Sequence, residues 1–151
     1  MNDIHFHLII NHFPIIGAIF SMIVLLIGVF IRSEVVKRTA YALFIITAIL
    51  CLPTNKSGED AEGKVKKVDG INENMIEEHE DMANFGFWTS LVTGLVSLLA
   101  LFLSFKENDL KGIFSVLVLA IAAVSIFYLW QTGETGGKIR HTETYKAEIS
   151  E

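Results

Sequence analysis

The chain has 151 residues, of which 52% are hydrophobic, and it carries a formal net charge of −5. This composition excludes an ordinary soluble domain, because the apolar residues are concentrated in runs long enough to cross a bilayer. The sequence has no basic patch, which excludes nucleic acid as a partner. We therefore expect one membrane domain, residues 1–151, with the lipid bilayer as its partner.

Four apolar runs have the length of membrane-spanning helices. They extend from Leu8 to Ile31, from Val35 or Thr39 to Pro53, from Phe85 to Phe105 and from Ile113 to Trp130. At 1.5 Å per residue they measure roughly 36, 22–28, 31 and 27 Å, against a hydrocarbon core of about 30 Å. The runs predict an all-α protein, a four-helix transmembrane bundle. Its second span is the weakest, because the longer version contains Lys37 and Arg38.

The first span opens with histidines and a proline. If its helix begins only near Phe13, Pro14 is a favourable first-turn residue. If the helix begins before His7, the same proline removes a hydrogen bond and kinks it. We do not expect this run to be a removable signal peptide, because no Lys or Arg precedes it and no small-residue cleavage site follows it.

Basic residues are unequally divided between the two sides of the predicted bundle. The two short connections between spans hold five of the 12 Lys and Arg residues: Arg32, Lys37, Arg38, Lys106 and Lys111. The positive-inside rule then places both connections in the cytoplasm and both termini outside. We expect a multi-pass protein of the cell inner (cytoplasmic) membrane.

Two phrases of the sequence occur twice. Ser57-Gly58-Glu59…Gly63-Lys64-Val65 matches Thr132-Gly133-Glu134…Gly137-Lys138-Ile139, and His7-x4-His12-Phe13 matches His79-x4-Asn84-Phe85. The matches predict two repeated helical hairpins, at about residues 5–66 and 74–141, related by a two-fold axis along the membrane normal. We interpret the two Gly-Glu phrases as loops that cap the hairpins.

The third span has a helix-start signal ahead of its apolar run. Asn74, followed three residues later by Glu77, is typical of a capping box. Met75, His79 and Met82 then fall at helical spacing on one face. The helix is therefore predicted to begin above the membrane, with His79 on its apolar stripe.

The histidines are the candidate chemical groups. All five (His5, His7, His12, His79 and His141) belong to the predicted outer end, as do the repeated acids Glu59 and Glu134. Ionisable groups at membrane depth usually line a site, and neutral imidazole suits an axial haem position or a Zn, Cu or Fe ion. The ordinary alternative is that these rings only bind water and loop carbonyls, which accounts for His5 or His141 alone better than for the cluster.

Other chemistries lack their motifs. No Cys-x-x-Cys-His occurs, which excludes covalently attached haem. No zincin motif, phosphate loop or Ser/His/Asp set is present, so a hydrolase has no nucleophile in this sequence. The activity that the residues allow is that of a redox, electron-transfer component.

The histidine phrases together resemble a family of small bacterial membrane proteins, domain of unknown function 2231. Its members open with His-Pro-Leu-Leu-Val-His-Phe-Pro and end with Thr-Gly…Gly-Gly-x-Leu-Val-Tyr-x-His. This chain departs from the pattern at Leu8, where the family has Pro, and at Ile139-Arg140, where it has Val-Tyr. The resemblance covers nearly the whole chain and implies four site residues: His7, His12, His79 and His141. Because some members are joined to a Rieske-type iron–sulfur domain, it also implies membrane redox chemistry.

Three hypotheses about function follow. The first is binding of haem b and electron transfer, with a redox protein or a quinone as partner. In it His7 and His79, at equivalent repeat positions, form the axial pair, and His12 pairs with His141. The second is a transition-metal site, in which the same histidines with Glu59 and Glu134 hold Zn, Cu or Fe. The third is a cofactor-free accessory subunit of a membrane complex.

The predicted topology can be tested directly. A reporter fused to either terminus should be found on the non-cytoplasmic side of the membrane, because the basic residues hold both short connections in the cytoplasm. A reporter that is active in the cytoplasm when fused to the C-terminus would contradict both the orientation and an outer histidine cluster.

Overall fold

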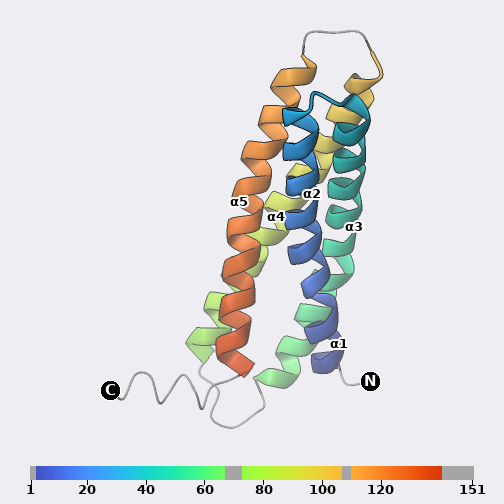
Figure 1. Ribbon diagram of the computed structural model, residues 1–151. Coiled ribbons are helices and arrows are strands. Elements are labelled where there is room, and N and C mark those ends of the chain that lie inside the picture. Colours follow the sequence, from blue (N-terminus) through green and yellow to red (C-terminus); the bar gives the residue numbers. More distant parts are fainter. Residues whose placement is uncertain (1–2, 67–72, 107–109, 141–151) are drawn as a thin grey trace, which may run out of the picture.

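The structure, a computed structural model, describes residues 3–66, 73–106 and 110–140 (Figure 1). Within these ranges all regular structure is helical: α1 (Asp3–Ile10), α2 (His12–Phe30), α3 (Glu34–Val65), α4 (Glu73–Ser104) and α5 (Lys111–Arg140). Four segments are long and apolar enough to cross a membrane: Phe6–Phe30, Glu34–Val65, Glu73–Ser104 and Lys111–Ile139. The predicted all-α fold with four candidate spans is confirmed.

The four long helices lie side by side, and α1 extends α2 along the same line (Figure 1). Helices α2 and α3, α3 and α4, α4 and α5, and α5 and α2 are in contact, which closes the bundle into a ring. We call the end where α1 begins and α5 ends the histidine end. The opposite end, where α2 passes into α3, is the connection end.

The structure agrees in part with each of the two predictions for Pro14. The helix begins before His7, but it is interrupted at Asn11, whose backbone N–H donates to the His7 carbonyl at 3.0 Å. Pro14 is buried in the first turn of α2. Because proline lacks an N–H, it cannot bond the carbonyl of Ile10, and the break between α1 and α2 lies at this turn.

The prediction that the Gly-Glu phrases form loops is wrong. Helix α3 continues through Pro53 to Val65, and α5 continues to Arg140, so both phrases are helical. Ion pairs one turn apart support these extensions: Lys56 with Asp60 at 3.1 Å, Lys66 with Glu62 at 2.5 Å and Lys138 with Glu134 at 3.1 Å. Burial of Ser57 and Thr135 against the rest of the bundle supports them further.

The start of the third span follows the sequence closely. The capping-box signal places the start near Asn74, and α4 begins at Glu73. His79 is half-buried on this helix. The helix therefore carries His79 on the bundle-facing side, as its apolar stripe predicts.

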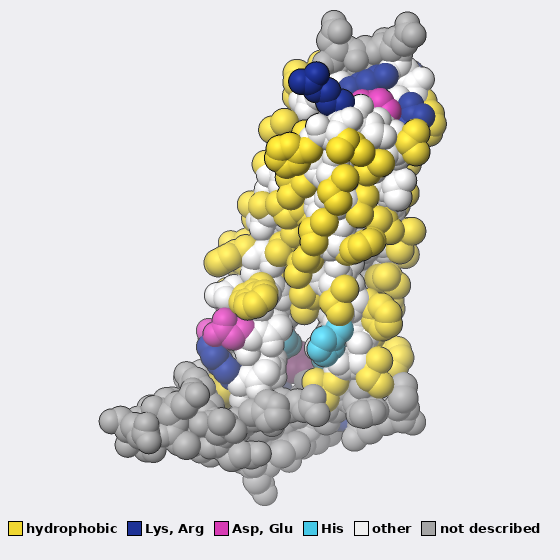
Figure 2. All heavy atoms as spheres, in the orientation of Figure 1, with side chains coloured by type: hydrophobic (Ala, Val, Ile, Leu, Met, Phe, Trp, Pro, Cys, Tyr) yellow, Lys and Arg dark blue, Asp and Glu magenta, His cyan; other side chains and the backbone are white. Residues whose placement is uncertain are grey.

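Small and hydroxyl-bearing residues make up much of the buried interior. Large apolar side chains are exposed, and they cover much of the face that Figure 2 shows. Ser90 and Ser125 share a hydrogen bond of 2.8 Å between α4 and α5, and Tyr41 shares one of 2.7 Å with Ser115. An apolar cluster that includes Leu25, Tyr41 and Phe44 packs nearer the connection end. This distribution is the one expected of helices that face lipid.

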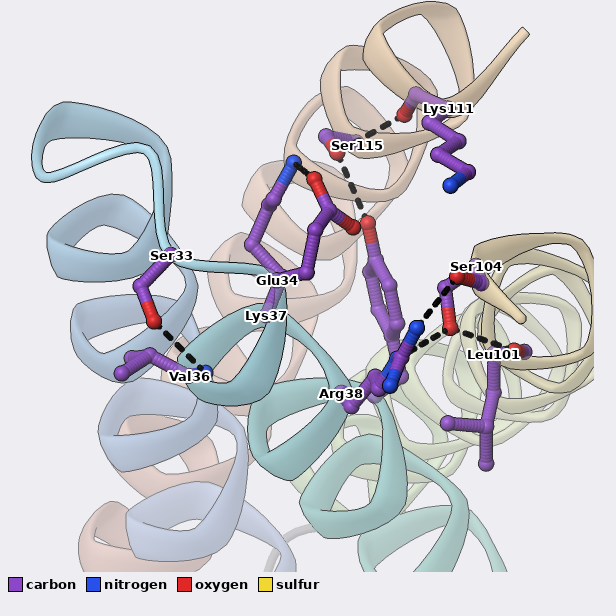
Figure 3. A network of polar contacts seen from close by, with 10 residues as sticks. Ser33, Glu34, Val36, Lys37, Arg38, Leu101, Ser104, Lys111 and Ser115 are labelled. Carbon is purple, nitrogen blue, oxygen red and sulfur yellow. Dashed lines mark hydrogen bonds and ion pairs between the residues drawn. The ribbon is translucent and has the colours of Figure 1, made fainter. Parts of the chain in front are cut away.

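Polar contacts tie α3 to its neighbours at the connection end (Figure 3). The Ser33 hydroxyl accepts from the Val36 N–H at 3.4 Å and caps the start of α3. Arg38 reaches across to α4, where its Nε donates to the Ser104 hydroxyl at 3.0 Å and Nη2 donates to the Ser104 carbonyl at 2.5 Å. The guanidinium also lies 4.1 Å from the centre of the Phe105 ring. These bonds satisfy carbonyl and hydroxyl groups where α4 ends.

Close helix approach makes a matched stability test possible. A Cβ on Gly94 would overlap the side chain of Ala48 on α3, whereas one on Gly112 would meet nothing within 4 Å. We expect Gly94→Ala to lower the free energy of unfolding by about 1–3 kcal/mol through overpacking. Gly112→Ala should leave it unchanged or raise it by up to about 1 kcal/mol. Unfolding in mixed micelles measures both, and equal effects of the two variants would contradict close packing of α3 on α4.

Candidate functional site

A cavity of about 480 Å³ opens at the histidine end, where the space-filling view is hollowed (Figure 2). All four spans contribute to its lining. Its walls are mainly apolar and include Pro14, Phe87 and Leu129, while His7 and His79 are among its polar groups. The volume and the lining, apolar with a few polar groups, are typical of a site for a small molecule or cofactor.

His7 reaches this cavity from α1 and is held against α3. Its Nδ1 lies 2.9 Å from the hydroxyl oxygen of Ser57. The ring packs on Gly58, where a Cβ would come within 3.2 Å of the His7 Cε1. The glycine therefore lets the imidazole lie directly on the surface of the helix.

His79 repeats this arrangement between α4 and α5. Its Nδ1 lies 3.0 Å from the hydroxyl oxygen of Thr135, and a Cβ on Gly136 would come within 3.1 Å of its Cε1. Both rings are partly buried and line the same cavity. The structure thus brings together the two histidines that the sequence pairs across the bundle axis.

His12 lies elsewhere. It is exposed on α2, and its Nδ1 donates to the Leu8 carbonyl one turn earlier at 3.0 Å. A contact of this kind is expected under the ordinary alternative, in which the histidine ring binds only water and backbone carbonyls. His5 lies in α1, and His141, with which we expected His12 to pair, falls outside the described residues.

The repeated acids do not join the histidines in a preformed ion site. Glu59 lines the cavity but is exposed, and it contacts Asn55 at 3.1 Å and Lys56 at 3.4 Å on its own helix. Glu134 is exposed and pairs with Lys138. Among the described residues, no three His, Cys, Asp or Glu side chains are grouped closely enough to hold a metal ion.

Sequence reasoning missed the residues that seat the two rings. Ser57-Gly58 and Thr135-Gly136 make equivalent contacts, yet the sequence comparison matched Ser57-Gly58 with Thr132-Gly133. A usable signal was present, because Thr54-x-x-Ser57-Gly58 and Thr132-x-x-Thr135-Gly136 share one spacing. The Thr-Gly-Glu phrase three residues earlier hid it, since its letters agree better.

Comparisons with known proteins add no relative. No model of a protein family matches the chain, and no curated protein or solved structure matches it. The family resemblance therefore stays a prediction from its histidine phrases.

Proposed function

We propose that this protein binds haem b between His7 and His79 and transfers electrons at the membrane. The observation that carries the proposal is that these two imidazoles, from the first and third spans, line one largely apolar cavity with Nδ1 already engaged. An imidazole whose Nδ1 is engaged offers Nε2 to iron. When bound, haem b would supply one-electron redox chemistry.

The composition of the cavity favours haem over a bare transition-metal ion. His7 and His79 would suffice as protein ligands of a haem iron, and the remaining binding energy would come from apolar contact with the haem ring. An ion such as Zn²⁺ needs about four ligands. Because Glu59 and Glu134 bond to neighbours on their own helices, they would have to rearrange to supply oxygen.

Matching burial supports the proposal that two hairpins are copies of one unit. The buried residues of α2 all recur 72 positions later as buried residues of α4: Pro14/Gly86, Ala18/Ser90, Ser21/Thr93, Leu25/Ser97 and Gly28/Ala100. The buried residues of α5 all correspond to buried residues of α3 at a spacing of 78: Lys37/Ser115, Ala40/Val118, Phe44/Ala122, Thr47/Ser125, Cys51/Leu129 and Ser57/Thr135. The second spacing is also that of the two hydroxyls that contact the histidines.

The charge distribution supports an orientation with the histidine end outside. The Lys and Arg residues of the two short connections lie at the connection end, and Figure 2 shows basic side chains gathered there. By the positive-inside rule this end faces the cytoplasm, and the cavity faces the opposite side of the inner membrane. Its electron partner would be a redox protein on that side or a quinone in the bilayer.

Three alanine variants test the axial pair. We expect His7→Ala and His79→Ala each to abolish stable haem binding, because each removes one axial ligand, and His12→Ala to retain it. The measurement is the haem content per chain after purification with added haem, together with the optical spectrum. His12→Ala is the control, since within residues 3–66, 73–106 and 110–140 its ring bonds to the Leu8 carbonyl on its own side of the bundle and does not line the cavity.

Three outcomes separate the hypotheses. Full haem content in His79→Ala would defeat the axial pair. The metal site would be favoured if the wild-type protein takes up no haem but binds a transition metal, and if Glu59→Gln lowers the affinity for that metal. A protein that binds neither would favour the accessory subunit.

A further inference from the structure

The two histidines are held by hydroxyl groups that are themselves hydrogen-bonded to the backbone. The Ser57 hydroxyl donates to the Thr54 carbonyl at 2.7 Å while it contacts the His7 Nδ1 at 2.9 Å. The Thr135 hydroxyl lies 2.9 Å from the Gln131 carbonyl and 3.2 Å from the Thr132 carbonyl while it contacts the His79 Nδ1 at 3.0 Å. Each hydroxyl oxygen thus sits between a backbone acceptor and an imidazole nitrogen.

Counting protons assigns the tautomer of both rings. A hydroxyl has one proton to donate, and a backbone carbonyl can only accept. If the Ser57 proton pointed at His7, two acceptor oxygens would face each other at 2.7 Å without a proton between them. Both short contacts are hydrogen bonds only when Ser57 donates to the carbonyl and accepts from the ring. The same count applies to Thr135 and His79.

We propose that Ser57 and Thr135 are positioning residues that fix His7 and His79 as Nδ1–H tautomers, so that both Nε2 lone pairs are available to a ligand. The tautomer belongs to the protein alone, whereas its effect on haem rests on the function proposed above. Neither hydroxyl has to touch the ligand. Their role is to select which nitrogen is free and how the ring is turned.

The glycines supply the second constraint on each ring. A Cβ on Gly58 would lie 3.2 Å from the His7 Cε1, and one on Gly136 would lie 3.1 Å from the His79 Cε1. Both distances are shorter than an ordinary van der Waals contact. Alanine at Gly58 or Gly136 would push the ring away from the neighbouring hydroxyl. The hydroxyl selects Nδ1 as the protonated nitrogen, and the glycine lets the ring approach closely enough to donate to that hydroxyl.

The tautomers can be read in the protein without any cofactor. Long-range proton–nitrogen NMR spectra of histidine-labelled protein in micelles, at a pH where the rings are neutral, distinguish protonated from bare ring nitrogens. Signals are assigned by their loss in His7→Gln and His79→Gln. We expect both wild-type rings to carry the proton on Nδ1, and Ser57→Ala and Thr135→Val to release their own histidine into a mixture of tautomers.

The conservative variants and a remote hydroxyl serve as controls. Ser57→Thr and Thr135→Ser keep the oxygen and should keep the tautomer. Ser21→Ala removes a buried hydroxyl that bonds the Gly17 carbonyl at 2.6 Å, and it should change neither ring. If Ser21→Ala altered the tautomers as much as Ser57→Ala, the effect would be one of general packing and the assignment would be overturned.

The consequence for haem is measured separately. Loss of such a supporting hydrogen bond typically lowers the affinity for the metal, or the activity, by about 10–100-fold. We expect that range in haem affinity for Ser57→Ala and Thr135→Val, with a raised midpoint potential because the imidazole becomes a weaker donor. Wild-type rings protonated on Nε2 would overturn the proposal even if haem binds. If both rings carry the proton on Nδ1 but the protein binds no haem, the proposed function is overturned and the assignment of the tautomers stands.

Discussion

The close approach of helices that have lipid on their outer side is the constraint on which this structure depends. In a bilayer there is no hydrophobic force to gather apolar side chains inside, so association relies on close packing and on hydrogen bonds between helices. A Cβ on Gly17 would lie 2.7 Å from the Thr47 hydroxyl, which shows how near α2 and α3 come. Large residues such as Phe20 and Leu95 are therefore exposed, while Ser97 and Thr93 are buried.

The same constraint explains why the site lies at one end. Where glycine, serine and alanine meet in the middle of the bundle, little space remains, and the void between Phe44 and Ser125 measures only about 10 Å³. Nearer the histidine end, the break at Asn11 and the long extensions of the helices enclose about 480 Å³. The space there is large enough for a small molecule or cofactor, and the two imidazoles line it.

The sequence predicts the spans well because their signal is local, and it predicts the site incompletely because the site is not. Length and hydropathy alone indicate four helices, and a run of apolar residues needs no partner to be recognised. The extensions past Pro53 and Trp130 depend on ion pairs and on burial against other helices, so composition suggested loops. His7 and His79 could be paired from their repeat positions. Ser57 and Thr135 share a spacing in the sequence, but their role becomes visible only in their contacts with a ring on another helix.

The register of the proposed repeat differs between the sequence match and the structure. Letters favour matching Ser57 with Thr132, whereas burial and the histidine contacts match it with Thr135. In a helix, a shift of three residues turns a side chain by roughly 60° and moves it about 4.5 Å along the axis, enough to take a hydroxyl out of reach of its ring. If the hairpins are copies, as we propose, both copies carry the oxygen beside Nδ1 and the glycine after it. The more conspicuous Gly-Glu dipeptide carries acids that bond along their own helices, so it is the less informative landmark.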